Sequence, residues 1–185
     1  MDRDSNRHTY LFAGIMVITI AFVLSFTSES LKELKLDNVK KEKMQNILST
    51  VGINVSRDES EDLYNQYIIE ELSLTHNGDI DQEVNAFNIN LALEIRKGLD
   101  DQRFPLYIAD VDNSKYYIIP LRGNGLWNAI WGYIALKQDI NTIEGISFGH
   151  EAETAGLGAE ITQDWFMNSF NDEKILNSNG EFVGI

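Results

Sequence analysis

The feature that most constrains this chain is an uninterrupted apolar segment close to its N-terminus. Residues 10–26 contain no charged side chain, and a run of about 17 such residues lies at the short end of what a helix needs to cross a membrane. A helix that is apolar on every side does not suit the surface of a soluble domain. Tyr10 stands at one edge of the run, where membrane helices often carry an aromatic residue. We therefore predict a short tail and one membrane anchor within residues 1–27.

Two questions about this anchor stay open at the level of composition. A cleaved signal peptide is the alternative, although Ser25-Phe26-Thr27 is a poor match to the small residues that precede a cleavage site. Basic residues near both ends indicate sidedness. Their count places the domain in the cytoplasm, with two before the span and five after it: Arg3, Arg7, Lys32, Lys35, Lys40, Lys41 and Lys43. Large domains, however, cross membranes largely regardless of charge.

Composition excludes several functions for the rest of the chain. The net charge is −14, and almost all of it lies between residues 44 and 185. Such a field repels phosphate backbones, so nucleic acid is not an expected partner. The absence of cysteine excludes disulfides, thiolate catalysis and iron–sulfur ligation by this chain. An apolar fraction of 43% argues against disorder and for a packed domain.

Residues 28–60 are expected to form a stalk or linker region. Apolar side chains recur at helical spacing from Ser28 to Val51, and Gly52 provides a stop signal. The pattern fits a stalk that packs on the domain or on a neighbouring subunit, and it fits a core helix of the domain equally well.

Residues 61–185 predict an α+β domain, built from a mostly antiparallel sheet with flanking helices. Asn77-Gly78 and Asp112-Asn113 are typical turns, and the second of them separates the two arms of a hairpin. Residues 85–99 are ambiguous between a strand and a short helix. Residues 161–170 predict one compact helix, with Trp165, Phe166 and Phe170 on its apolar side and a cap at or near Thr162. The expected strands are 67–74, 105–109, 116–121, 131–136 and 142–148.

Two glycine-rich segments are the candidates for a binding site. Gly123-Asn-Gly-Leu-Trp127 allows close approach of a ligand to the backbone, although the pattern alone favours a simple turn with a core tryptophan. Gly149-His-Glu-Ala-Glu-Thr-Ala-Gly-Leu-Gly158 can turn consecutive amides towards an anion or a reduced aromatic ring. Its His150, Glu151 and Glu153 follow no zinc spacing, so no metal is predicted. The segments contain no nucleophile motif, P-loop or dinucleotide fingerprint.

Together these segments resemble a known family. Gly125-Leu-Trp, Gly132-Tyr-Ile-Ala-Leu136, the run from His150 to Ile161, and Trp165 are similar to the FMN-binding domain of membrane redox pumps. That family includes the C subunit of the sodium-translocating NADH:quinone reductases and, as a close relative, the G subunit of the Rnf electron-transport complexes. The likeness is densest over residues 120–170, with the anchor in the expected place. Ala155 departs from the proline that the family usually carries.

The resemblance implies FMN as cofactor and names the residues that would bind it. They are Leu126, Trp127, Glu153, Thr154, Gly156, Leu157 and Gly158. The amides near Gly156 and Gly158 would stabilise a reduced ring, the two leucines would restrict water, and Trp127 would pack near the ring. Glu153 would orient the loop. Electron relay requires no proton-transfer base, so no catalytic residue is assigned.

The family attaches FMN covalently to the threonine of a Ser-Gly-Ala-Thr motif, and that motif is missing here. None of the eight threonines follows Ser-Gly-Ala. Thr154 matches a different residue of the family and is not expected to replace the linked one. Because residues 181–185 look like an interrupted strand, we expect a domain that is incomplete at its C-terminus and that cannot form the covalent bond.

The function implied by the resemblance is electron transfer within a respiratory complex. The chain would be part of an NADH:ubiquinone reductase (Na+-transporting), a translocase, and inactive alone. Its partners would be the other subunits and the lipid bilayer of a bacterial inner membrane, with the domain in the periplasm. Two alternatives are an Rnf-type subunit and a tethered assembly domain without flavin.

Overall fold

The computed structural model describes residues 6–183. It divides into two compact units, residues 1–40 and 41–185. Helix α1 (Asn6–Ser30) and the first part of α2 (Lys32–Ser49) belong to the first unit. The second unit contains the end of α2 and everything that follows, so it begins inside the region expected to be a stalk.

Helix α1 has the length and composition of a membrane span. Its 25 residues correspond to a rise of about 37 Å, and none of them is buried. The hydroxyls of Thr19 and Thr27 donate to the backbone carbonyls of Ile15 and Val23, each at 2.8 Å. Such bonds satisfy polar groups that lipid cannot pair. A signal sequence near an N-terminus has the same length and composition.

One residue, Leu31, separates the end of α1 from the start of α2. The single helix predicted from Ser28 to Val51 is therefore interrupted at Leu31. The two halves of α2 differ in exposure. Leu34 is 61% exposed, whereas Ile47 and Leu48 are fully buried against the sheet. The C-terminal half is therefore a core helix of the domain, which was one of the two interpretations that the sequence allowed.

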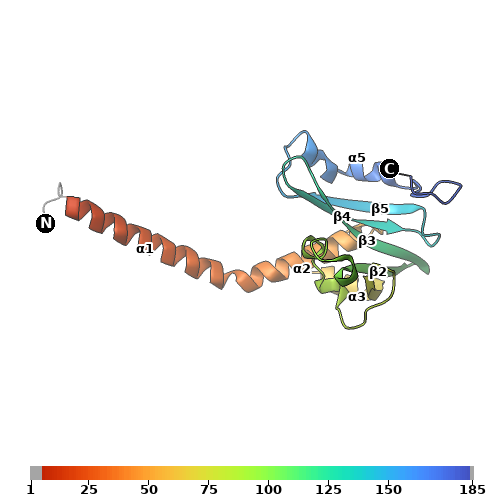
Figure 1. Cartoon of the computed structure of the whole chain (residues 1–185), viewed down its shortest axis with the longest axis horizontal. Coiled ribbons are helices and arrows are strands. Elements are labelled where there is room, and N and C mark those ends of the chain that lie inside the picture. Colours follow the sequence, from red (N-terminus) through yellow and green to blue (C-terminus); the bar gives the residue numbers. More distant parts are fainter. Residues whose placement is uncertain (1–5, 184–185) are drawn as a thin grey trace. The chain divides into compact units, whose positions relative to one another are not determined.

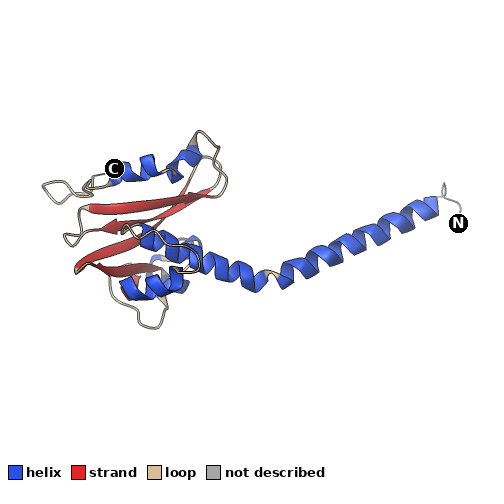
Figure 2. Cartoon of the chain, turned by 180° about the vertical axis from the view of Figure 1, so that it is seen from behind, coloured by secondary structure: helices blue, strands red, loops and turns tan. Residues whose placement is uncertain are grey.

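Five antiparallel strands form one sheet in the order of the sequence, β1-β2-β3-β4-β5. Figure 1 and Figure 2 show this arrangement from opposite sides. The strands are β1 (Ile68–Thr75), β2 (Arg103–Val111), β3 (Ser114–Asn124), β4 (Ala129–Leu136) and β5 (Ile143–His150). The predicted class, an apolar N-terminal helix followed by a mostly antiparallel sheet with flanking helices, is confirmed.

Each face of the sheet has its own apolar core, because side chains alternate along a strand. Ala135 faces the cluster built on α2 and on α3 (Ser60–Tyr67), which contains Tyr64 and Tyr107. Ile134 and Leu136 face the opposite cluster, which includes Phe170. The sheet is thus covered by α2 and α3 on one side and by the C-terminal helical segments on the other.

The predicted hairpin is present, and its turn explains its stability. Asp112 and Asn113 join β2 to β3 with φ angles of 52° and 63°. Positive φ at both central residues matches the right-handed twist of the two strands, and asparagine and aspartate tolerate it better than most residues do.

The ambiguous residues 85–99 are helical. They form η1 (Ala86–Asn88) and α4 (Leu91–Glu94), followed by η2 (Leu99–Asp101). The side chains of Asn85 and Asn90 cap the first two segments by accepting from the amides of Asn88 and Ala92. An asparagine side chain can form local hydrogen bonds with nearby backbone amides, and these bonds compete with the pairing of strands.

The helix predicted over residues 161–170 is wrong in three respects: its continuity, the burial of Trp165 and the cap at Thr162. The segment is split into η3 (Gly158–Thr162), α5 (Asp164–Met167) and η4 (Asn168–Phe170). Phe166 and Phe170 pack on Phe148 of β5, but Trp165 is 65% exposed. Thr162 donates to the Ala159 carbonyl and does not cap a helix. Near the C-terminus, Phe182 makes only an isolated bridge with Leu176, and residues 184–185 lie outside the described part.

Candidate functional site

Two loops lie at the same end of the sheet and form the candidate site. The tryptophan loop (residues 125–128) connects β3 to β4, and the glycine loop (residues 151–158) follows β5. Asn124 pairs with Ala129, and Ile130 pairs with His150. In the sheet, β4 lies between β3 and β5. The start of β4 therefore lies beside the end of β3 and the end of β5, so both loops emerge at the same end of the sheet.

The carboxylate of Glu153 joins the two loops. Its Oε1 accepts a hydrogen bond from the Trp127 amide at 3.0 Å and a longer one from the Asn128 amide at 3.5 Å. Two glycines leave room for it. A Cβ at Gly158 would lie 2.5 Å from Glu153 Oε2, and a Cβ at Gly125 would overlap Oε1. The Glu153 carboxylate therefore links the glycine loop to backbone amides of the tryptophan loop.

Trp127 is held in position although it is exposed. Its indole Nε1 donates to Thr154 Oγ1 at 3.1 Å, and its backbone amide donates to Glu153. The side chain is 69% exposed, so the alternative of a core tryptophan is wrong. A fixed aromatic ring open to solvent is a platform on which a flat ligand can stack.

Gly156 has the conformation that only glycine adopts without strain. Its φ is +75°, and no atom lies within 4 Å of the position where a Cβ would be. Its amide donates to Glu160 Oε1 at 3.0 Å. The amides of Leu157 and Ala159 both donate to the Thr154 carbonyl at 3.1 Å. Three amides that were expected to face a ligand thus have partners within this segment.

The two leucines of the site point away from the core. Leu126 is 83% exposed and Leu157 is 72% exposed, one on each loop. With Trp127, they give this end of the sheet three large exposed apolar side chains. Exposed apolar groups on joined loops mark a surface for an apolar or aromatic partner.

The loops fit the ring of a flavin better than its phosphate. Neither loop contains lysine or arginine, and the glycine loop carries Glu151 and Glu153. His150 serves the loop itself, because its Nδ1 accepts from the Glu153 amide at 3.3 Å. Among residues 6–183, no group of three acidic or histidine side chains is placed to hold a metal ion.

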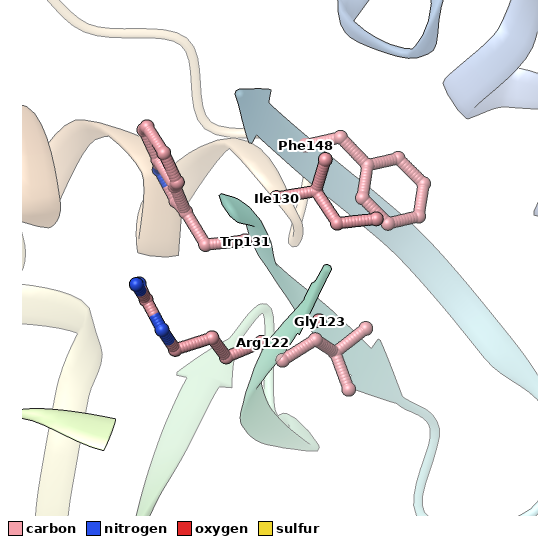
Figure 3. A pocket seen from close by; sticks show the side chains of 6 residues that line it. Arg122, Gly123, Ile130, Trp131 and Phe148 are labelled. Carbon is pink, nitrogen blue, oxygen red and sulfur yellow. The ribbon is translucent and has the colours of Figure 1, made fainter. Parts of the chain in front are cut away.

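A shallow apolar groove of about 250 Å³ lies next to the tryptophan loop. Its lining comes from β3, β4 and β5, and none of the predicted site residues contributes to it. Figure 3 shows Trp131 and Arg122 together on one side of these strands, and Ile130 and Phe148 on the other. The complete lining is Leu121, Arg122, Gly123, Ile130, Trp131 and Phe148.

Sequence reasoning did not identify this groove or the roles of Gly125 and Glu160. Gly123 and Gly132 occupy neighbouring positions in β3 and β4, and glycine inside a strand often marks a place of close approach. That pattern was the available signal for the groove. Gly125 depends on Glu153, which lies in a loop after a different strand, and no local pattern reveals this contact.

Comparisons with known proteins agree with this geometry. Residues 125–183 match the model of the FMN-binding domain family, a range that contains both loops. The chain is 26% identical to the C subunit of the Na(+)-translocating NADH-quinone reductase of Haemophilus ducreyi, over 92% of this chain and 70% of that protein.

Solved structures show the same fold. The crystal structure of the C subunit of the Na(+)-translocating NADH-quinone reductase from Parabacteroides distasonis matches with a TM-score of 0.77 and 37% identity, over 83% of this chain and 74% of that one. Shewanella oneidensis NqrC matches with a TM-score of 0.65 at 21% identity, over 79% of this chain and 78% of that one.

The fold and the two joined loops define an FMN-binding-type domain. Within that class, the chain belongs to the family formed by the C subunits of the Na(+)-translocating NADH-quinone reductases.

Proposed function

We propose that this chain is a flavin-carrying electron-transfer subunit of a membrane respiratory complex that couples NADH oxidation and quinone reduction to sodium translocation. The relatives and structural neighbours named above carry the name of this reductase, which supports it over the Rnf-type alternative. The observation that carries the proposal is Trp127, whose ring is exposed while its indole donates to Thr154 and its backbone amide donates to Glu153.

Each predicted residue then has a physical role. The indole of Trp127 supports one face of the ring, and Leu126 and Leu157 cover its edges and exclude water. Glu153 and Thr154 hold the loops in register. Gly156 allows the backbone to approach the ligand without a side chain in between, and Gly158 leaves room for the Glu153 carboxylate. Bound FMN would supply the electron-transfer chemistry, while the protein supplies binding, orientation and electrostatics.

In this proposal the two loops hold the flavin ring by packing and hydrogen bonds. Neither loop contains a Ser-Gly-Ala-Thr sequence, and Thr154 Oγ1 accepts a hydrogen bond from the Trp127 indole. Because neither loop carries a basic residue, the phosphate would extend away from them. The ring, rather than the phosphate, is the part that this site selects.

The proposed setting is a bacterial inner membrane. Helix α1 would cross the bilayer once, and the FMN-binding domain would face the periplasm, against the direction indicated by the lysine count. The domain would exchange electrons with other subunits, so the isolated chain would be inactive. Protease treatment of intact spheroplasts tests the sidedness: degradation of the domain is expected, and its protection would exclude a periplasmic location.

Flavin binding is tested with the full chain in detergent micelles. FMN fluorescence should be quenched on addition of the protein, because stacking on an indole quenches the ring. Trp127→Ala should weaken binding at least about fivefold, since stacking of an aromatic ligand contributes about 1–3 kcal/mol. Trp165→Ala is the matched control, because Trp165 is equally exposed but makes no hydrogen bond to either loop.

The outcomes separate the alternatives. Quenching that depends on Trp127 and not on Trp165 supports the flavin site. Absence of quenching by the folded chain would favour the tethered assembly domain without flavin. Equal loss in both variants would place the ligand elsewhere on the domain.

A further inference from the structure

The amide of Gly156 is occupied by a side chain of the protein itself. Glu160 Oε1 accepts from this amide at 3.0 Å, four positions further along the chain. The Glu160 side chain is partly buried, and among residues 6–183 no lysine or arginine forms an ion pair with it. An anion therefore already lies on the donor that was expected to receive a negatively charged ligand.

This hydrogen bond differs from the others in the segment. The amides of Leu157 and Ala159 donate to the Thr154 carbonyl, and the Glu160 amide donates to the Leu157 carbonyl. Those acceptors are backbone atoms and cannot leave unless the segment unfolds. The acceptor of Gly156 is at the end of a side chain, which can rotate. Gly156 is thus a donor that can be released while the fold stays intact.

The space next to Gly156 allows such an exchange. No atom lies within 4 Å of its hypothetical Cβ, so a ligand can reach this part of the backbone. A carboxylate at hydrogen-bond distance from the same amide competes with any anionic group there. Its charge also raises the free energy of a second negative charge nearby, although solvent screens part of this effect because the contact is exposed.

We infer that Glu160 determines which redox form of the flavin this site prefers, and that it favours the oxidised, neutral ring over the reduced, anionic one. This inference rests on the proposed function. At pH 8, two electrons and one proton convert the neutral ring into a reduced ring with one negative charge. Glu160 opposes that charge and occupies the amide that would otherwise stabilise it, so it lowers the reduction potential of the bound flavin.

The test compares the affinities of oxidised and reduced FMN by anaerobic equilibrium dialysis against the full chain in micelles at pH 8, with dithionite as the electron donor. Glu160→Ala removes the charge and frees the amide. It should shift the ratio of the two dissociation constants about tenfold towards the reduced form, equivalent to about 30 mV for a two-electron couple. Glu160→Gln removes the charge but keeps an acceptor oxygen, so its shift should be smaller and in the same direction.

Glu151→Gln is the matched control. Glu151 lies on the same loop, is exposed and carries the same charge, but its carboxylate does not contact Gly156. In Glu151→Gln, the ratio of the two dissociation constants should change by less than about twofold. An equal shift in Glu151→Gln and Glu160→Ala would mean a general charge effect and would overturn the assignment to Glu160.

A second readout does not need flavin. With selective ¹⁵N-glycine labelling of the 13 glycines, the Gly156 amide should exchange with solvent several-fold faster in Glu160→Ala than in the wild type, and unchanged in Glu151→Gln. Unchanged exchange in Glu160→Ala would overturn the inference. Absence of binding of both FMN forms to the wild-type chain would overturn the proposed function, and the redox role of Glu160 with it. If both FMN forms bind but Glu160→Ala leaves the ratio of their dissociation constants unchanged, the inference about Glu160 is overturned and the proposed function is not.

Discussion

The backbone amide of Trp127 donates to Glu153 Oε1 at 3.0 Å and so connects two loops whose residues are 26 positions apart in the chain. A hydrogen bond to a charged acceptor contributes more than one between neutral groups. This contact fixes the backbone of Trp127, and the hydrogen bond from its indole to Thr154 orients the ring, so the geometry of the candidate site depends on both.

Glu153→Ala should therefore lower the free energy of unfolding by about 0.5–1.5 kcal/mol, since the amides of Trp127 and Asn128 lose their acceptor at an exposed site. Urea unfolding followed by tryptophan fluorescence measures this, because all three tryptophans lie in the domain. Glu151→Ala, on the exposed neighbour, should change stability by less than about 0.5 kcal/mol. Equal losses in the two variants would contradict a specific role for Glu153.

Gly125→Ala should be destabilising in the wild type and less so when Glu153 is absent. The added methyl group would overlap Glu153 Oε1 and lie 3.0 Å from the Asn128 carbonyl oxygen. In a double-mutant cycle with Glu153→Ala, the two substitutions should show an interaction energy of about 0.5–3 kcal/mol. Gly156→Ala provides the comparison: it should cost about 1–2 kcal/mol through its positive φ alone, with no coupling to Glu153.

Stability should rise with pH through the range in which Lys43 loses its proton. Burial lowers the pKa of Lys43 from 10.5 to about 8, although Glu71 opposes this shift. Between these two pH values the unfolded chain binds a proton that the folded chain does not, so unfolding becomes less favourable as pH increases. Above about pH 10 the trend should reverse, because burial raises the pKa values of Tyr64 and Tyr107 and only the unfolded chain then loses their protons.

Urea midpoints at pH 7, 8, 9 and 10 measure this dependence. The expected gain from pH 8 to pH 10 is about 1–2 kcal/mol, less than the full pKa shift implies, because the ammonium group stays partly in water. Lys43→Met should remove most of the rise while keeping the side-chain volume. If the rise persists in that variant, another group is responsible.

The two halves of α2 should respond differently to truncation. Leu48 is fully buried and Leu36 is 63% exposed. Leu48→Ala should cost about 2–5 kcal/mol through lost burial and a cavity, whereas Leu36→Ala should change the stability of the domain by less than about 0.5 kcal/mol. Urea unfolding distinguishes them, and a large loss for Leu36→Ala would mean that the first half of α2 also stabilises the domain.

Strands and turns were predictable because their signals are local. Alternating side chains indicated the sheet, and Asp112-Asn113 indicated the tight turn whose two positive φ angles the structure contains. The segment after the glycine loop was predicted wrongly. Its aromatic residues suggested one apolar helix face, but α5 is a single turn, which leaves Trp165 outward and only Phe166 and Phe170 against the sheet.

The candidate site residues came from the resemblance, and their role in ligand binding stays a prediction. The resemblance selected Trp127, Glu153 and Thr154, and in the structure Trp127 donates a hydrogen bond to each of the other two. It did not reveal that Gly125 and Gly158 make room for a carboxylate, or that Glu160 reaches the Gly156 amide. Those contacts depend on the backbone path of two loops, which sequence periodicity does not describe.

The order of the strands has a consequence for how the protein is made. Each strand pairs with the one translated just before it, so the sheet can grow as the chain leaves the ribosome, one hairpin at a time. The tryptophan loop emerges with its partner carboxylate still untranslated. A nascent chain would therefore contain the residues of all five strands before Glu153 is added, and the two loops could be joined only after that.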